Sequence, residues 1–239
     1  EITDKASFLK AVRESGIVGL GGAGFPTHIK LAPKTKVDCL VVNGAECEPY
    51  ITADYRVMLE YADDLIEGLS KTADMLEIPK IIIGIENNKP EAIRLLTEKT
   101  SSLNKFEIKS LPSAYPQGGE KVLIYNCTGR IVKEGKLPAD EGVIVMNVST
   151  AVFLNVYLKT GMPFVNRILT VDGDTVKKSG NYCVPIGTSV SYILDQCECD
   201  KDKINKLIMG GPMMGISQFS VDVPVIKGTN AILAFCGDE

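Results

Sequence analysis

The chain has 239 residues, of which 45% are hydrophobic and 23% charged, and 26 Lys+Arg against 30 Asp+Glu give a formal net charge of −4 at pH 7. This length and composition are typical of a globular protein with one large or two unequal domains. No apolar run approaches the roughly 20 residues of a membrane-spanning helix, and the acidic balance lacks the basic footprint of a nucleic-acid binder. We therefore expect no direct membrane span and no nucleic acid among the partners.

The cysteines and the histidine restrict the expected metal chemistry. Seven cysteines are irregularly spaced, no Cys-x-x-Cys pair occurs, and His28 is the only histidine. We expect no disulfide framework, no metal ligands in this chain and a reducing compartment. The chain starts with Glu1 rather than methionine and stops soon after a strand-like run. We therefore interpret it as a fragment of a longer protein.

The first two thirds of the chain alternate between helical and strand patterns. An amphipathic helix is predicted over 4–15, with Asp4 as its cap and Gly16 after its end. Beyond it, short apolar runs typical of buried strands alternate with apolar residues at helical spacing. They predict strands over 37–42, 80–85, 106–111 and 143–148, and helices over 54–78, from the cap Asn88 past Pro90, over 120–127 and over 150–159.

This alternation predicts an α/β fold, a parallel sheet with helices on both faces. Ligands of such folds bind in loops at the carboxyl ends of the strands. Three loops fall at that position, 43–54, 113–119 and 147–150. We expect the binding site to lie among them.

After Pro163 the pattern changes to short strands separated by Gly, Pro, Asn and Asp. Strands are predicted over 167–171, 180–184 and 231–235, with a short helix over 189–196, which together indicate a small, mostly β, α+β unit. Met213 and Met214 are expected to pack against an apolar surface. The predicted domains are 1–163 and 164–239.

Residues 19–24, Gly-Leu-Gly-Gly-Ala-Gly, satisfy the G-x-G-x-x-G pattern of dinucleotide-binding folds. The required context is missing, because a helix precedes the pattern and Phe25-Pro26 follows where an uninterrupted helix should begin. Glycines nevertheless let backbone N–H groups approach a phosphate closely, and Lys30 adds a positive charge. The sequence favours a phosphate-binding loop; the alternative is a tight glycine turn without a ligand.

Two further segments place acids at predicted strand ends. Residues 43–49 include Glu46 and Glu48, and residues 115–120 carry an aromatic, a glycine pair and Glu120. Carboxylates at these positions can accept hydrogen bonds from ribose or amide groups of a nucleotide. The alternatives are solvated loop acids and, for Glu120, a favourable acid in the first turn of a helix.

Taken in order, these motifs resemble a known family of flavoproteins. Gly-Gly-Ala-Gly-Phe-Pro-Thr-His-Ile-Lys-Leu, Glu-Cys-Glu-Pro-Tyr-Ile-Thr-Ala-Asp, Tyr-Pro-Gln-Gly-Gly-Glu-Lys and Gly-Gly-Pro-Met-Met-Gly are similar to the flavin-binding fold of the NADH-oxidising subunit of respiratory complex I. They more closely resemble RnfC, the peripheral subunit of the Rnf electron-transport complex. The second half resembles the soluble-ligand-binding β-grasp (SLBB-like) domain of that family.

The resemblance implies which residues bind FMN and NAD(H). FMN would lie on the glycine loop, bound by Gly19, Gly21, Gly22, Ala23, Gly24, Lys30, Asn43, Glu46, Tyr115, Gly118, Asn147 and Thr150. Phe25, Glu48 and Glu120 would contact NAD(H). This sequence departs from the complex I pattern at Leu20, Pro33, Ala45 and Gly119. Either Lys133 or Lys136 could match a nucleotide-contacting lysine of that pattern. No side chain is assigned as catalytic.

The resemblance also implies a role for the whole protein. It would exchange hydride between FMN and NAD(H), and single electrons with [4Fe-4S] clusters that lie in the full-length protein but not in this chain. It would act within an ion-translocating ferredoxin:NAD+ oxidoreductase, peripherally at the cytoplasmic face of the membrane. Its partners would be other Rnf subunits and, indirectly, ferredoxin.

Two alternatives remain open at the level of the sequence. A flavin-dependent cobalamin reductase of bacterial microcompartments resembles RnfC in its flavin domain but passes electrons to a corrinoid. A non-catalytic docking scaffold would leave the glycine loop empty, and the differences at Leu20, Ala45 and Gly119 favour it.

Overall fold

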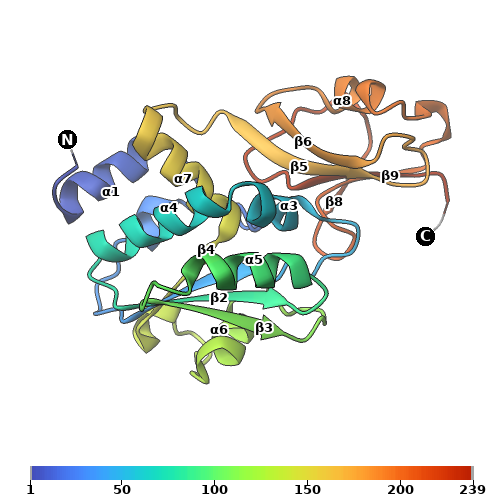
Figure 1. Ribbon diagram of the computed structural model, residues 1–239. Coiled ribbons are helices and arrows are strands. Elements are labelled where there is room, and N and C mark those ends of the chain that lie inside the picture. Colours follow the sequence, from blue (N-terminus) through green and yellow to red (C-terminus); the bar gives the residue numbers. More distant parts are fainter. Residues whose placement is uncertain (1, 238–239) are drawn as a thin grey trace.

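The computed structural model describes residues 2–237 and contains two sheets, each with its own helices (Figure 1). The parallel-sheet unit, as we call the first, holds four strands and seven α-helices within the described residues. Its strands are β1 (Cys39–Gly44), β2 (Lys80–Glu86), β3 (Phe106–Leu111) and β4 (Val143–Asn147). Its helices are α1 (Lys5–Glu14), α2 (Thr27–Lys30), α3 (Ala53–Glu60), α4 (Ala62–Met75), α5 (Pro90–Thr100), α6 (Glu120–Thr128) and α7 (Val148–Thr160), with a 3-10 turn η1 (Pro138–Glu141).

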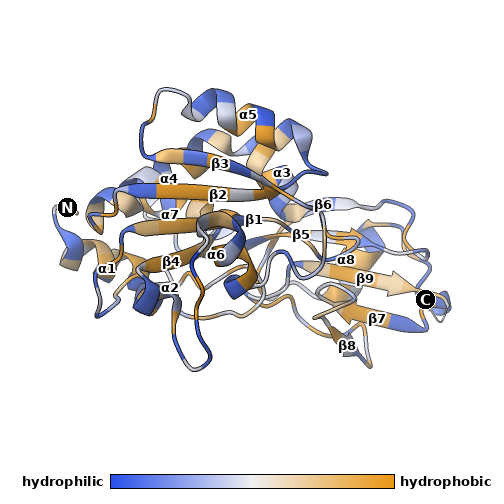
Figure 2. Cartoon of the chain, turned by 90° about the horizontal axis from the view of Figure 1, so that it is seen from below, coloured by the Kyte–Doolittle hydropathy of each residue, from blue (hydrophilic) through white to orange (hydrophobic). Residues whose placement is uncertain are grey.

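All strands of this sheet are parallel, in the order β3-β2-β1-β4. Alternate residues of the strands face opposite sides, so Leu40 and Val42 belong to a core shared with α1, α3, α4, α5 and α7, whereas Cys39 and Val41 belong to one shared with α6. Burial on both faces explains why the strands read as continuous apolar runs, and Figure 2 shows β2 and β4 as largely hydrophobic. The predicted α/β architecture with helices on both faces is confirmed.

The mixed-sheet unit, as we call the second, follows α7. It contains β5 (Asn166–Asp172), β6 (Gly180–Pro185), α8 (Val190–Gln196), a 3-10 turn η2 (Lys201–Lys203), β7 (Lys206–Met209), β8 (Ile216–Gln218) and β9 (Ala231–Phe235). The strand order is β6-β5-β9-β7-β8, with β5 and β9 parallel and the other pairs antiparallel. Val190, Ile193 and Leu194 of α8 share a core with the sheet. The predicted α+β unit is therefore confirmed.

Several local predictions are wrong. The helix expected over 54–78 is two helices, α3 and α4, because Tyr61 leaves the helical conformation (φ −119, ψ 30) and both caps α3 and starts α4. The cap expected at Asn88 is at Lys89, and the Asn88 Oδ1 that a cap would use accepts from Lys89 Nζ at 3.0 Å instead. The first strand begins at Cys39 rather than at residue 37, and the N–H groups of Asp38 and Cys39 both donate to the Gly142 carbonyl, just before β4.

The boundary predicted at 163 remains a prediction. Phe164, which begins the second predicted domain, packs edge-on against Phe153 of α7 with ring centroids 4.9 Å apart. Its N–H donates to the Ser15 carbonyl at 2.8 Å. The start of the second predicted domain therefore contributes to the core of the parallel-sheet unit.

No helix within residues 2–237 combines the length and apolar character needed to cross a membrane.

Candidate functional site

The glycine loop, residues 19–24, closes on itself and leaves three backbone donors without partners. Gly19 N–H donates to the Phe25 carbonyl at 2.8 Å, and Gly24 N–H donates to the Gly19 carbonyl at 3.2 Å. The N–H groups of Gly21, Gly22 and Ala23 have no hydrogen-bond partner within residues 2–237, and all three residues are exposed. Gly22 has φ +116 and Gly24 φ +62, backbone conformations that residues other than glycine rarely adopt. The loop is therefore a set of free donors of the kind that binds an anion.

The loop is held against the amino end of α7. Leu20, between the glycines, is buried, and its N–H donates to Thr150 Oγ1 at 3.0 Å. A Cβ on Gly21 would lie 3.6 Å from the Asn147 side chain, in ordinary contact. Asn147 caps α7 by accepting from Thr150 N–H at 3.2 Å. The predicted site residues Gly21, Asn147 and Thr150 are thus brought together, although Gly21 lies more than 120 residues before the other two in the chain.

The loops after β1 and β3 are joined by hydrogen bonds. Asn43 Nδ2 donates to the Gly118 carbonyl at 2.9 Å, and Gly118 N–H donates to Cys47 Sγ at 3.3 Å. A Cβ on Gly118 would lie 3.3 Å from this sulfur, which is tighter than ordinary contact. Tyr115, in the same loop, is 44% exposed. The parallel sheet therefore gathers Asn43, Tyr115 and Gly118 at one edge, as the sequence predicted; Cys47 was not singled out by the sequence.

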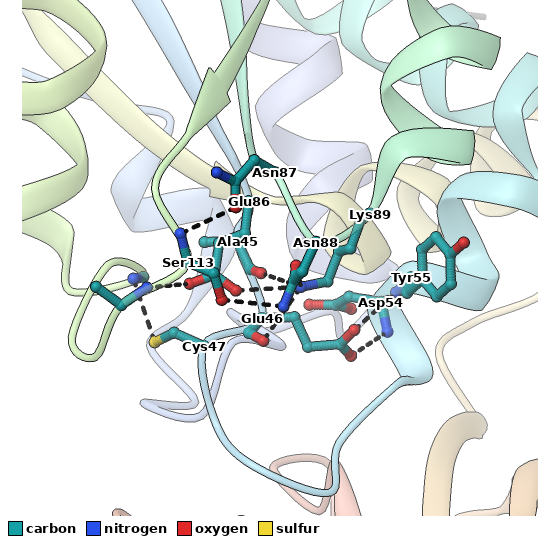
Figure 3. A network of polar contacts seen from close by, with 12 residues as sticks. Ala45, Glu46, Cys47, Asp54, Tyr55, Glu86, Asn87, Asn88, Lys89 and Ser113 are labelled. Carbon is teal, nitrogen blue, oxygen red and sulfur yellow. Dashed lines mark hydrogen bonds and ion pairs between the residues drawn. The ribbon is translucent and has the colours of Figure 1, made fainter.

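Two half-buried carboxylates, Glu46 and Asp54, lie behind this edge (Figure 3). Glu46 accepts from the backbone N–H groups of Asp54 at 2.6 Å and Tyr55 at 3.0 Å. Asp54 in turn accepts from the Asn147 amide at 2.6 Å and from the Ser149 hydroxyl. Burial raises the pKa of Glu46 well above its ordinary value, and the neighbouring Asp54 adds to that rise. Burial also raises the pKa of Asp54, against the hydrogen bond from Ser149. Glu46 thus ties the loop after β1 to the start of α3.

The predicted phosphate lysine has an acid beside it. Lys30, at the end of α2, forms an ion pair with Glu120 of α6, with Nζ and Oε1 2.6 Å apart. Both side chains are more than a third exposed, so the pair is worth at most about 1 kcal/mol and can open for a ligand. Phe25, between the glycine loop and α2, is 46% exposed. Lys30, Glu120 and Phe25 therefore line the solvent-facing side of the site.

Glu48 contacts the mixed-sheet unit. Its Oε2 accepts from Met213 N–H at 2.9 Å, and its Oε1 is buried without a hydrogen-bond partner in the described residues. Met213 and Met214, predicted to pack against an apolar surface, are instead 53% and 76% exposed, because this loop turns its backbone toward Glu48. The Gly-Gly-Pro-Met-Met-Gly segment thus joins the strand-end loop after β1.

A buried ion pair beneath the β1 loop was not foreseen from the sequence (Figure 3). Lys89 Nζ lies 3.2 Å from Glu86 Oε2 and donates to the Ala45 carbonyl at 2.7 Å and to Asn88 Oδ1 at 3.0 Å. The side chains of Lys89 and Glu86 are 8% and 2% exposed. The only sequence signal for this ion pair is that Glu86 and Lys89 lie three residues apart, between the end of a strand and a helix that starts at Pro90. Lys89 holds the chain just before Glu46.

A cavity of about 550 Å³ lies away from this edge. It opens beside the amino ends of β1, β2 and β3, and its wall includes Asp38, Lys80, Glu107, Cys127 and Arg130. None of the predicted site residues lines it, so we place the candidate site at the glycine loop, where free donors and strand ends meet. No group of three or more His, Cys, Asp or Glu side chains within residues 2–237 is arranged to hold a metal ion.

The raised pKa of Asp54 predicts how stability changes with pH. A raised pKa in the folded protein gives a contribution that is complete below the ordinary value, 3.8 for Asp54, and is lost as the pH rises through the folded value. Asp54→Asn keeps partners for Asn147 and Ser149 and removes the titration. The variant should therefore gain stability relative to wild type as the pH rises, by about 1.4 kcal/mol for each unit of raised pKa.

Urea unfolding from about pH 4 to about pH 8 measures this difference. Asp63→Asn is the matched control, because Asp63 is 86% exposed in its pair with Lys99. It measures the effect of removing a carboxylate from an exposed position. A flat or falling difference for Asp54→Asn would contradict the raised pKa.

A parallel sheet whose strand-end loops meet a glycine loop with free donors defines an α/β protein that binds its ligand at the carboxyl edge. The Nuo51 FMN-binding domain family (Complex1_51K) matches residues 12–157. The chain belongs to this family.

Curated relatives extend the similarity over nearly the whole chain. The RnfC subunit of the Na(+)-translocating ferredoxin:NAD(+) oxidoreductase complex of Acetobacterium woodii is 46% identical over 98% of this chain and 53% of its own length. Its counterpart in the proton-translocating ferredoxin:NAD(+) oxidoreductase complex of Clostridium ljungdahlii is 45% identical over 97% of this chain and 51% of its own length. The chain thus spans about half the length of these relatives. The predicted resemblance to RnfC is confirmed.

Solved structures share the fold. An NAD+-reducing [NiFe]-hydrogenase in the H2-reduced state matches with a TM-score of 0.81 at 22% identity, over 97% of this chain and 47% of that one. The air-oxidised state of an NAD+-reducing [NiFe]-hydrogenase matches with a TM-score of 0.77 at 23% identity, over the same shares of the two chains. At this identity the likeness shows the fold alone.

Proposed function

We propose that the chain binds FMN at the glycine loop. The observation that carries this proposal is the set of free, exposed N–H groups of Gly21, Gly22 and Ala23, which suits the phosphate of a flavin mononucleotide. Lys30 supplies a positive charge beside them once its pair with Glu120 opens. The membership in the Nuo51 FMN-binding domain family supports the same assignment.

The remaining cofactor contacts come from the strand ends. Tyr115 is exposed enough to lie against the flavin, while Asn43 and Gly118 form the joined edge of the β1 and β3 loops. Asn147 and Thr150 hold the glycine loop through the first turn of α7. Glu46 keeps the β1 loop in place through its hydrogen bonds to the backbone of Asp54 and Tyr55. These side chains bind and orient the group; none of them is required to supply an acid or base.

NAD(H) is the proposed substrate. When bound, FMN supplies the chemistry, because a flavin can accept a hydride from a nicotinamide and release electrons one at a time. Phe25 is exposed beside the glycine loop and would stack near the nicotinamide, while Glu120 would contact the ribose or carboxamide. Glu48 is proposed for the same set, although its Oε2 is engaged by Met213 in this structure.

The role of the full-length protein follows the relatives' names. We propose a subunit of a membrane-associated ferredoxin:NAD+ oxidoreductase of the Rnf type, which exchanges electrons with [4Fe-4S] clusters outside this chain. Its partners would be the other Rnf subunits, with ferredoxin reached indirectly. It would lie at the cytoplasmic face of the membrane as a peripheral subunit. The two curated relatives, each named as a component of such a complex, support this proposal.

Titration of FMN into the purified chain, followed by flavin fluorescence, tests the proposal. We expect saturable binding by wild type and an affinity about ten- to a hundredfold lower in Lys30→Ala, because a hydrogen bond to a charged group contributes about 1.5–3 kcal/mol. Lys34→Ala, which removes an exposed lysine four residues away, is the control and should bind like wild type.

Anaerobic addition of NADH then tests the substrate. Bleaching of the bound flavin is the expected result. Binding without bleaching would remove the nicotinamide site and keep the flavin site. Absence of saturable binding by wild type would reject both.

A further inference from the structure

One arginine of the mixed-sheet unit is buried against the glycine loop. Arg167, in β5, is 1% exposed and is among the largest fully buried side chains of residues 2–237. Its Nη2 donates to the Leu20 carbonyl at 2.9 Å, and its Nε donates to the Thr229 carbonyl at 2.9 Å. Its Nη1 is buried and has no hydrogen-bond partner within the described residues. A buried arginine is costly unless specific contacts offset the burial, and the Leu20 and Thr229 carbonyls supply two of them.

The carbonyl that Arg167 holds determines where the glycine loop points. In a trans peptide the C=O of one residue and the N–H of the next lie in one plane and point in opposite directions. A Leu20 carbonyl directed at Arg167 therefore directs the Gly21 N–H away from the mixed-sheet unit. The Leu20 N–H is fixed separately by Thr150 Oγ1 at 3.0 Å. Both polar backbone groups of Leu20 are thus held, one from each unit, and the first free donor of the loop has a fixed direction.

The charge of Arg167 also interacts with the half-buried carboxylates of Asp54 and Glu46. Burial lowers the pKa of Arg167 to about 10, and the nearby Asp54 and Glu46 oppose that change. Asp54 accepts from the amide of Asn147, which caps α7, where Thr150 holds Leu20. The guanidinium is therefore connected to the loop directly through a carbonyl and indirectly through Asp54 and the start of α7.

We propose that Arg167 is a positioning residue of the flavin site, by which the mixed-sheet unit directs the Gly21 N–H at the FMN phosphate. This inference rests on the proposed binding of FMN. It assigns the second unit a share in cofactor binding that none of the predicted site residues provides, because all of those lie before residue 151. If the proposal is right, Arg167 affects binding of the FMN phosphate and not binding of the rest of the flavin.

The test compares FMN with riboflavin, which lacks the phosphate, in wild type, Arg167→Met and Arg167→Lys. We expect wild type to prefer FMN, and Arg167→Met to bind FMN about ten- to a hundredfold more weakly while its riboflavin affinity changes little. Lysine keeps the charge but cannot donate from two separated nitrogens to Leu20 and Thr229, so Arg167→Lys should show a smaller loss. A general loosening of the fold would weaken both ligands alike.

Lys227→Met is the matched control. Lys227 is another cation of the mixed-sheet unit that donates to a carbonyl of the first unit, that of Gly16. Its variant should keep the wild-type preference for FMN over riboflavin. An unchanged preference in both Arg167 variants would overturn the inference, and if Arg167→Met does not fold, Arg167→Lys alone decides. Failure of wild type to bind FMN would instead reject the proposed function.

Discussion

Replacing Lys89 with methionine is expected to lower the free energy of unfolding by about 3–5 kcal/mol, since removal of one partner leaves a buried charge unpaired. The stranded partner is Glu86, whose side chain is 2% exposed and lies 3.2 Å from Lys89 Nζ. The Ala45 carbonyl loses its donor at the same time. The substitution therefore also loosens the chain that leads to Glu46, and FMN affinity should fall with stability.

A double-mutant cycle separates the charge from the packing. Glu86→Gln in the Lys89→Met background removes the unpaired carboxylate and should recover at least about 1 kcal/mol relative to the sum of the single effects. Lys80→Met is the control, because its pair with Glu107 is roughly half exposed and should contribute less than about 1 kcal/mol. Equal losses of unfolding free energy in the Lys80 and Lys89 variants, measured by urea unfolding, would show that the buried pair stabilises the fold no more than the exposed pair does.

The sheet was predictable because its strands are buried on both faces. Val143 to Met146 and Ile81 to Ile83 form continuous apolar runs that no surface helix would show. The short strand β8 gave no such signal, since Ile216 is 70% exposed and its partners lie on one side only. The break at Tyr61 was equally invisible, because the apolar spacing of α3 continues into α4 without a glycine or proline.

The loops of the site could be grouped from the sequence, but the supports behind them could not. Parallel strands bring Asn43 and Asn147 side by side by register alone. Arg167 and Leu20, in contrast, meet across 147 positions of the chain through a contact between the two sheets. A single arginine at the start of a predicted strand looks like a surface residue, and only the packing of the two units shows that Arg167 is buried.

The same packing of the two units leaves no room for a side chain at Gly211. A Cβ added there would overlap Glu48 Oε2 and lie 2.8 Å from Glu48 Cβ, so the strand-end loop after β1 would have to move. Gly211→Ala should lower the free energy of unfolding by about 2–4 kcal/mol, from overpacking and from the lost hydrogen bond between Glu48 and Met213 N–H. Gly180→Ala is the control, because its Cβ would meet only the Tyr182 ring, at 3.7 Å.

The cause of that loss can be tested by removing the obstacle. Glu48→Ala takes away the atoms that the new Cβ would meet, so Gly211→Ala should cost about 1–3 kcal/mol less in the Glu48→Ala background than in wild type. Additive effects would mean that the alanine acts through the backbone of its own loop. Coupled effects would show that the contact between Glu48 and residue 211 stabilises the packing of the two units. For Glu48 to contact the nicotinamide as proposed, its carboxylate would then first have to leave the Met213 N–H.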